Sequence, residues 1–495
     1  MGANLLLRGG RVIDLAQNLD AVADVAIVDG RISAVGPNLA PPPDAQVLNV
    51  QGQIVSPGFL DIHVHAYGGL AFADPDTIGV NFGTTAMIDA GGLGSYTWDE
   101  FEAVMLGRTR TDLYVWLMLR APGIYGADAS ERIGRTLIDI PINRMQDQVD
   151  QHPDVIRGVK VTMYASNGMG PARIGKGVGN VLGLPIYVHI GEIFDRPDVT
   201  YTREVLDLLE PRDFVTHCYH GNPGKLLDDD GRLLPQALAA RERGVLFDTG
   251  HGAFNFSFDV AERALEQGFL PDTISSDLQQ ANVLGPVYSL MHCMSGLMAI
   301  GMSLHDVLRR VTVDAAAAVG LSDRHGALLP GRAADVTVCH LESGEFEFED
   351  SSGGRRPGRE LLVPVLTVKG GELIHPDRVP AEDFSNWSLE GAIAYDAVPD
   401  AAAALDQPQR AFLARLAAAC RDLDRWQGVA VHETFHRTQQ AAGIPLRDAL
   451  LATLDSFLTN RFYPPVGFFL ATLDRDLVQS RLDQVAAGRP ASVPV

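Results

Sequence analysis

Cysteines and long hydrophobic runs are scarce in this chain, and each scarcity excludes a class of protein. The four cysteines lie far apart and form no C-x-x-C pair, so we expect reduced thiols in a cytoplasm; they are Cys218, Cys293, Cys339 and Cys420. No apolar stretch reaches the roughly 18 residues that a membrane-spanning helix needs. Residues 1–8 lack the basic start and small-residue cleavage site of a signal peptide. The sequence therefore predicts a cytoplasmic protein without a membrane partner.

Basic residues are also in short supply. The chain has 40 lysines and arginines against 62 aspartates and glutamates, which gives a formal net charge of −22. A nucleic-acid surface needs basic patches, so a nucleic-acid partner is not expected. With 495 residues the chain is too long for one ordinary core, and we expect two or three domains.

The central part of the chain has the pattern of a parallel α/β protein. Between residues 57 and 325, short apolar runs alternate with helical stretches. The predicted strands are 58–65, 84–89, 113–119, 156–163, 185–190, 213–218, 245–248 and 273–277. This number of strands, over a segment of this length, is typical of a (β/α)8 TIM-like barrel.

The two flanks of this segment resemble each other in texture. Residues 1–56 and 326–378 alternate short apolar runs with turn signals, such as Asp29-Gly30, and we expect them to pair into one small β-sandwich domain. From residue 380 to 495, alanine, leucine and phenylalanine recur at helical spacing, which predicts a separate all-α domain.

Two histidines close the first apolar run of the predicted barrel. Residues 59–65 have strand spacing, so His63 and His65 point to the same side. Two imidazoles on one face at a strand end can bind one metal ion. An isolated pair of this kind also fits an ordinary strand whose histidines lie at its rim.

Further polar residues lie on later predicted strands of the barrel. Lys160 belongs to the strand 156–163, while His189, His217 and Asp277 end three others. Each residue alone has an ordinary explanation: a packed histidine, a charge at a strand edge or a helix N-cap. Barrel active sites are built at the carboxyl ends of the strands, so the joint pattern favours one shared site.

These residue types suit a metal-dependent hydrolase. Neutral imidazoles and carboxylates bind Zn²⁺. A deprotonated lysine can add CO₂ to form a carbamate, whose two oxygens could bridge two cations. Two metals about 3.5–4 Å apart can hold a bridging hydroxide and polarise a carbonyl. Asp277 would take the proton of that water and deliver it to the leaving group. A one-metal site with uncarboxylated Lys160 stays open as a variant.

The set formed by His63, His65, Lys160, His189, His217 and Asp277 resembles the amidohydrolase superfamily, and within it the dihydroorotase-like amidohydrolase/deacetylase group. The resemblance covers residues 4–376. The segments that carry it are 67–69, 74–77, 83–85, 89–91, 188–191, 216–221, 246–252, 271–277 and 362–371.

The resemblance implies a role for each residue of the set. His63, His65 and Asp277 would bind a buried zinc ion, His189 and His217 a more exposed one, and carboxylated Lys160 would bridge the two. His251 and Gly252 would face the substrate, unless His251 is only a loop histidine. We expect Arg120 to pair with a substrate carboxylate, with a rim salt bridge as the alternative. Tyr164 and Glu192 could reshape the pocket.

Two patterns mark the C-terminal part. Residues 432–436 match the zinc motif H-E-x-x-H, which places His432 and His436 on one helix face. No third ligand follows in the sequence, so protease chemistry is not expected.

Residues 409–485 resemble the C-terminal helical domain of class I lysyl-tRNA synthetase. Residues 381–495 contain more acidic than basic residues, which argues against a tRNA site.

The sequence thus predicts a cytoplasmic hydrolase with two zinc ions that cleaves an amide, cyclic amide or ester bond of a small carboxylate-bearing substrate. We also expect a homo-oligomer. The alternative is an inactive barrel that acts as a scaffold, with a helical domain that binds a partner or tRNA.

Overall fold

The computed structural model describes residues 4–68, 75–124, 140–163, 168–193, 200–376, 389–460 and 462–488. Tyr164 lies outside these ranges, and so do parts of the segments 67–69 and 74–77 that contributed to the family resemblance.

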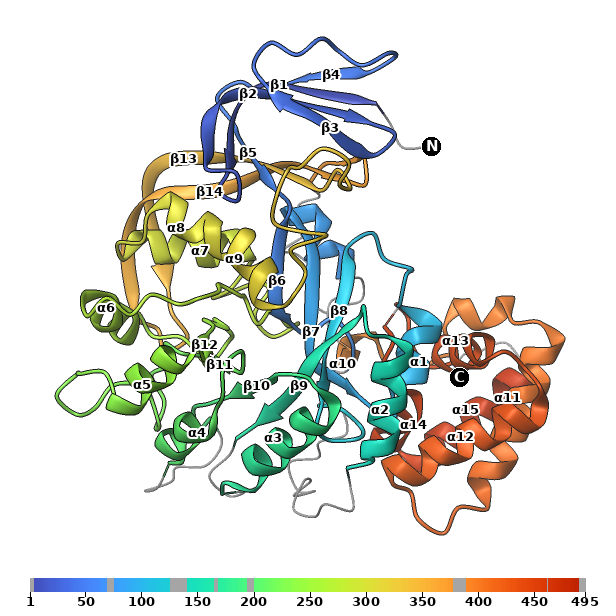
Figure 1. Cartoon of the computed structure of the whole chain (residues 1–495). Coiled ribbons are helices and arrows are strands. Elements are labelled where there is room, and N and C mark those ends of the chain that lie inside the picture. Colours follow the sequence, from blue (N-terminus) through green and yellow to red (C-terminus); the bar gives the residue numbers. More distant parts are fainter. Residues whose placement is uncertain are drawn as a thin grey trace.

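Strands from both flanks of the chain form one sheet, at the top of Figure 1. Its order is β15-β14-β13-β5-β1-β2-β3, with β4 beside β1. The two flanks meet where β5 pairs antiparallel with β13, and Val55 lies opposite Val338. The strands are β1 (Leu5–Asp14), β2 (Leu19–Val28), β3 (Arg31–Gly36), β4 (Gln46–Asn49), β5 (Ile54–Pro57), β13 (Val336–Glu349), β14 (Arg355–Lys369) and β15 (Glu372–Ile374).

This sheet has local causes in the sequence. Asp29 and Gly30 both adopt positive φ, at 49° and 74°, which is the backbone that a two-residue hairpin between right-twisted strands requires. Alternating apolar residues, such as Val25 and Ile27 of β2 and Val336 of β13, are buried together in a core of their own. These residues of the sheet therefore form a hydrophobic cluster of their own, whereas Ile54 of β5 and Cys339 of β13 belong to the cluster of the barrel.

The second sheet contains seven parallel strands in sequential order. They are β6 (Phe59–Val64), β7 (Thr84–Gly94), β8 (Asp112–Met118), β9 (Ile156–Thr162), β10 (Ile186–His189), β11 (Phe214–Thr216) and β12 (Leu246–Phe247). Helices follow the strands on the outer side, as Figure 1 shows. They are η1 (Pro75–Thr77), η2 (Val80–Phe82), α1 (Trp98–Val104), α2 (Ile142–Gln151), α3 (Gly170–Leu182), α4 (Thr202–Leu208), α5 (Pro235–Arg243), α6 (Phe258–Glu266), α7 (Leu290–Ala299), α8 (Leu304–Arg310) and α9 (Val313–Ala318).

The eighth predicted strand, 273–277, is not a regular strand. It makes isolated parallel bridges instead, from Thr273 to Asp248 after β12 and from Leu278 to Val64 in β6. Asp277 has φ 51°, a left-handed conformation that interrupts extended pairing at the end of the segment. Because the two bridges reach both edges of the parallel sheet, the segment closes the curled sheet into a TIM-like α/β barrel.

The described part of the C-terminal region is helical and lies beside α1 and α2, at the right of Figure 1. Its helices are α10 (Leu389–Ala392), η6 (Asp400–Ala404), α11 (Gln407–Arg421), α12 (Gly428–Ala442), α13 (Leu446–Asp455), α14 (Val466–Thr472) and α15 (Arg475–Ala486). Phe412, Phe435 and Phe469 belong to the same buried cluster as Phe101 of α1. These helices therefore share a continuous core with the barrel, and their status as an independent domain remains a prediction.

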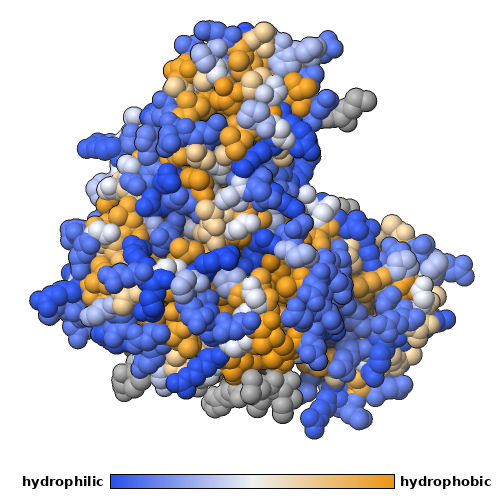
Figure 2. All heavy atoms as spheres, in the orientation of Figure 1, coloured by the Kyte–Doolittle hydropathy of each residue, from blue (hydrophilic) through white to orange (hydrophobic). Residues whose placement is uncertain are grey.

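The outer face of the C-terminal helices in this view is mostly hydrophilic, as Figure 2 shows. Within the described residues, no helix combines the length and the hydrophobicity that crossing a membrane requires.

Candidate active site

His63 and His65 reach the same carboxylate from the end of β6. All residues of this strand are buried, and both histidine side chains point toward Asp277. The distance from His65 Nε2 to Asp277 Oδ1 is 3.0 Å, and from His63 Nε2 it is 3.4 Å. The alternation of the strand therefore brings both imidazoles to one face, as the spacing predicted.

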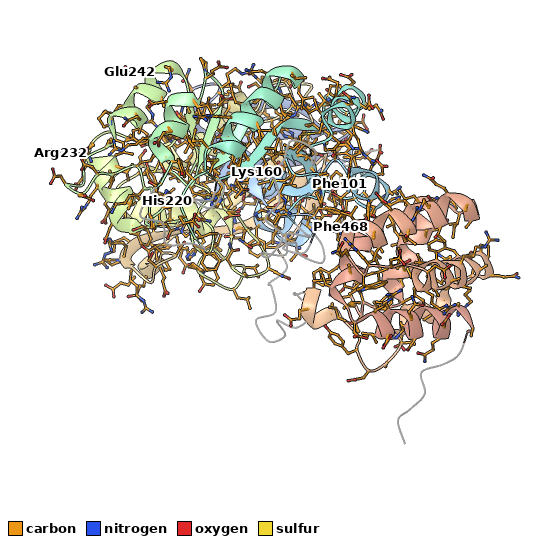
Figure 3. All side chains as sticks on the ribbon, turned by 90° about the horizontal axis from the view of Figure 1, so that it is seen from below. Phe101, Lys160, His220, Arg232, Glu242 and Phe468 are labelled. Atoms are coloured by element: carbon orange, nitrogen blue, oxygen red, sulfur yellow. The ribbon has the colours of Figure 1, made fainter. Side chains whose placement is uncertain are left out.

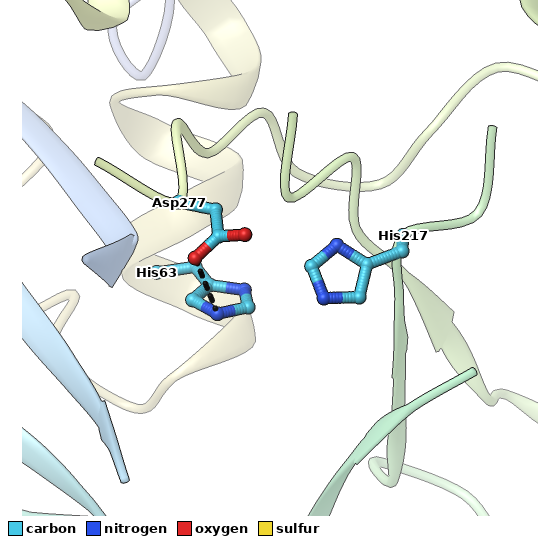
Figure 4. A group of neighbouring side chains, drawn as sticks. All are labelled: His63, His217 and Asp277. Carbon is cyan, nitrogen blue, oxygen red and sulfur yellow. Dashed lines mark ion pairs between the residues drawn. The ribbon is translucent and has the colours of Figure 1, made fainter. Parts of the chain in front are cut away.

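Two further members of the predicted set lie in a strained backbone conformation. His217 and Asp277, which follow β11 and the bridging segment, have φ values of 65° and 51°. Such left-handed conformations cost non-glycine residues about 1–3 kcal/mol and gather at functional sites. Figure 4 shows His63, His217 and Asp277 pointing toward one another from three separate segments. We take this strain as a sign that the two side chains are held there for function.

The hydrogen bonds of His63 determine which of its nitrogens carries the proton. Its Nδ1 lies 2.9 Å from the hydroxyl of Tyr187 and 3.0 Å from that of Thr216. Both hydroxyls donate their own hydrogens to Asp248 Oδ2, so they can only accept from His63. Nδ1 is therefore protonated, and the Nε2 lone pair is directed toward Asp277.

His217 is oriented in the same sense. Its Nδ1 donates to the carbonyl of Gly250 at 2.6 Å, which leaves Nε2 as the lone-pair nitrogen. The ring of His189 lies 4.3 Å from that of His217, centroid to centroid. Burial lowers the pKa of His63, His189 and His217 well below its usual value, and the neighbouring Lys160 lowers it further. All three imidazoles are therefore neutral at pH 7, the form that binds metals.

Lys160 lies inside this group, on β9. Its Nζ is 3.3 Å from His63 Nε2 and lies 4.6 Å from the centre of the Tyr187 ring. Burial lowers the pKa of Lys160 to about 8, although Asp277, Asp248 and Asp89 oppose the shift. A substantial fraction of this amine is therefore neutral near pH 8. Figure 3 places Lys160 and His220 inside the barrel, whereas Arg232 and Glu242 lie at its outer rim.

The donor set fits a divalent metal ion. Asp277 Oδ1 and His65 Nδ1 are buried atoms that form no hydrogen bond with any described residue. Oδ1 instead faces two imidazole nitrogens, and a buried carboxylate in such surroundings gains most from a bound cation. Nitrogen and oxygen ligands of this kind suit zinc and related ions.

The predicted substrate residues lie beside Asp277. Gly252 has φ 61°, and a Cβ at this position would stand 2.3 Å from Asp277 Oδ2. His251 is buried, its ring stacks on Phe256 at 4.2 Å, and burial lowers its pKa to about 3. Arg120 follows β8 and donates to the carbonyl of Gly123 at 3.0 Å. The structure thus brings His251 and Gly252 to the site, and Arg120 shapes the loop after β8.

Sequence reasoning missed residues that support the predicted set. Asp248, at the end of β12, accepts hydrogen bonds from four hydroxyl groups, those of Tyr187, Thr216, Thr273 and Ser275. Asn255 Nδ2 lies 3.4 Å from Asp277 Oδ2. The only signal in the sequence was an aspartate directly after a short apolar strand. This pattern alone does not distinguish a residue that orients the site from an ordinary turn residue.

A cavity opens next to the ends of β9 and β10. It is lined by Met163, Ile190, Gly191, Glu192, Thr200, Tyr201, Thr202, Val205 and Pro223. Glu192, which the sequence associated with the shape of the pocket, is thus a wall of this cavity.

Comparison with known proteins identifies the family. The model of the amidohydrolase family matches residues 257–366. A deacetylase from Brucella anthropi is 32% identical over 369 residues, which are 73% of this chain and 90% of the relative. The crystal structure of a dihydroorotase superposes with a TM-score of 0.68 at 32% identity, and that of an adenine deaminase with 0.68 at 30%. They cover 76% and 75% of this chain, respectively, and the whole of each solved chain.

The chain belongs to the amidohydrolase family. It is therefore an enzyme, a hydrolase that acts on carbon–nitrogen bonds other than peptide bonds. About a quarter of the chain has no counterpart in either solved structure.

Proposed function

We propose that the chain hydrolyses an N-acyl or cyclic amide of a small carboxylate, with two zinc ions held by six residues at the ends of the barrel strands. The proposed ligands are His63, His65, Lys160, His189, His217 and Asp277. The observation that carries the proposal is the convergence of imidazoles on one buried carboxylate, with Lys160 among them.

Each residue has a defined task in this proposal. When bound, the ions supply Lewis acidity, which lowers the pKa of a water and polarises the scissile carbonyl. Lys160, as a carbamate, would contribute two oxygens that neutralise charge between the ions. Asp248 keeps His63 in the tautomer with a free Nε2 through Tyr187 and Thr216.

Asp277 performs the proton transfer. Its carboxylate accepts the proton of the attacking water and returns it to the nitrogen of the leaving group. The Asn255 side chain, near Oδ2, and Gly252, which leaves that oxygen uncovered, keep the carboxylate in place. His251 and Arg120 would contact the substrate, and the cavity beside Glu192 would receive its variable part.

The relatives define which substrates to test. One is called a deacetylase, and the two solved structures are a dihydroorotase and an adenine deaminase. We would therefore assay the zinc-loaded protein with N-acetyl-D- and L-amino acids, hydantoins, dihydropyrimidines and adenine. Turnover of an N-acetyl or cyclic-amide acid supports the proposal, and turnover of adenine alone contradicts the substrate class.

Lys160→Ala tests the role of the lysine. We expect activity to fall at least 1000-fold, about 4 kcal/mol of transition-state stabilisation, because the bridging ligand is lost, and short carboxylic acids to restore part of it. His340→Ala, a change of an exposed histidine on β13, is the control and should keep full activity. Metal content is measured on both proteins. Full activity of Lys160→Ala without an added acid would refute the assignment.

The alternative of an inactive scaffold receives no support from the relatives, which are enzymes by name. The resemblance of residues 409–485 to a synthetase domain, the cytoplasmic location and the homo-oligomer remain predictions from the sequence.

A further inference from the structure

A second group of metal-binding side chains lies where the barrel meets the C-terminal helices. Glu100 belongs to α1, and His432 and His436 belong to α12. Glu100 Oε1 lies 3.0 Å from His436 Nε2 and 3.3 Å from His432 Nδ1. These three residues, here called the interface triad, join segments more than 300 positions apart in the chain.

The third ligand that the H-E-x-x-H motif lacked in sequence is therefore supplied by the barrel. His432 and His436 are four positions apart on one helix face, with ring centroids 4.5 Å apart. Tetrahedral zinc with bonds of about 2.0–2.1 Å separates neighbouring ligand atoms by about 3.3 Å. The two distances to Glu100 Oε1 match that separation.

The triad is rigidly supported. Glu100 is fully buried, and its second oxygen, Oε2, accepts a hydrogen bond from the backbone of Val466 at the start of α14. Gly467 brings α14 against His432, because a Cβ there would lie 2.1 Å from the His432 Cα. Figure 3 shows Phe101, next to Glu100, and Phe468, next to Gly467, at this boundary. Buried and fixed ligands are what a metal site requires.

One atom of the triad lacks a hydrogen bond. His432 Nδ1 is buried, and in its present orientation it forms no hydrogen bond with any described residue, including Glu100. Its side chain is 8% exposed. An unsatisfied buried nitrogen directed at a carboxylate is explained if a cation lies between the two.

A third group of acidic and histidine side chains differs from the interface triad, because a lysine neutralises it. Asp112, His325 and Asp335 also lie close together, but Lys369 Nζ stands 2.7 Å from both aspartates and neutralises them. Among the described residues no lysine or arginine forms an ion pair with Glu100. The positive charge in the interface triad must come from protonated histidines or from a bound ion.

We propose that Glu100, His432 and His436 bind one zinc ion, or a similar borderline divalent metal, which fastens the C-terminal helices to the barrel. Two neutral imidazoles and one carboxylate suit such an ion. The proposed role is structural, because Glu433, which corresponds to the general base of a protease with this motif, is exposed whereas His432 is buried.

Metal titration of the full-length protein tests the proposal. Metal-depleted wild type, His436→Gln, Glu433→Gln and His340→Gln are titrated with zinc against a chromophoric chelator, and bound zinc is counted by plasma mass spectrometry. We expect wild type and both controls to bind one equivalent more than His436→Gln. Equal stoichiometry in all four proteins would overturn the proposal, whatever the barrel site binds. If Glu433→Gln also lost the additional equivalent of zinc, the structural role would be overturned.

A measurement on wild type alone keeps the proposal testable if the variant folds poorly. His436 is partly exposed, with 19% of its side chain accessible. Zinc should therefore protect it from carbethoxylation by diethyl pyrocarbonate, and peptide mass spectrometry of residues 428–447 reads this out. We also expect zinc to slow proteolytic cleavage within residues 389–488. Modification and cleavage at rates that zinc leaves unchanged would refute the site.

Discussion

Gly252 illustrates how a single residue limits the candidate site. Its φ of 61° is accessible to glycine without strain, and its missing side chain leaves room for Asp277 Oδ2. A methyl group in the same place would overlap with that oxygen. The residue therefore determines where the proposed proton carrier stands, although it has no chemical function of its own.

Gly252→Ala should lower kcat about 100-fold, because a displacement of the carboxylate by about 1 Å has an effect of that size. The matched control is Gly268→Ala, which has φ 75° but no atom within 4 Å of the new Cβ. Both variants carry the backbone strain of a positive φ, and Gly252→Ala should lose additional stability because its methyl group overlaps with Asp277 Oδ2. Kinetics together with thermal unfolding separates the two effects. Equal kcat values in the two variants would contradict the steric argument.

At the scale of secondary-structure elements, the sequence predicted the positions of the barrel strands well, but it did not predict the hydrogen bonds that hold the site residues in place. Apolar runs located β6 to β12, since burial on both faces of a parallel strand leaves a clear pattern. The segment 273–277 was predicted as an eighth strand because the left-handed backbone conformation of Asp277 cannot be recognised from the hydropathy pattern. The network around Asp248 joins strands that are adjacent only in space, so no local pattern could reveal it.

The contact between α12 and α14 also joins residues that are close only in space, and it can be tested by mutation. Gly467→Ala places a Cβ 2.1 Å from the His432 backbone, so α14 must move away. We expect a loss of about 1–3 kcal/mol in the free energy of unfolding. Gly177→Ala in α3, where the Cβ meets open space, should instead gain about 0.5–1 kcal/mol. Urea unfolding of both variants measures the difference, and a Gly467→Ala protein as stable as wild type would refute the close packing.

At the scale of the whole molecule, the buried apolar residues of the described part of the chain form three clusters. One lies within the flanking sheet and one among the barrel strands, whereas the third joins the barrel to the C-terminal helices and to residues of the flanking sheet such as Ile54 and Cys339. The cysteines are distributed over these parts, with Cys218 and Cys293 in the barrel, Cys339 in β13 and Cys420 in α11. All four thiols nevertheless belong to the cluster that these parts share, so their reactivity reports on its openings.

Native-state alkylation would follow these openings. Burial raises the pKa of Cys339 to about 12 and that of Cys420 to about 11, and it also raises the pKa of Cys218 and Cys293. Because only the thiolate reacts and a raised pKa favours the thiol, at pH 8 about one in 1000 Cys420 side chains or fewer is ionised. Iodoacetamide should leave all four cysteines unlabelled in native protein and label all four in urea. At intermediate urea, Cys339 and Cys420 should react together with Cys218, because all of them belong to one buried cluster. Peptide mass spectrometry resolves the four sites, and labelling of Cys339 or Cys420 at a urea concentration that leaves Cys218 unlabelled would show that this cluster does not open as one unit.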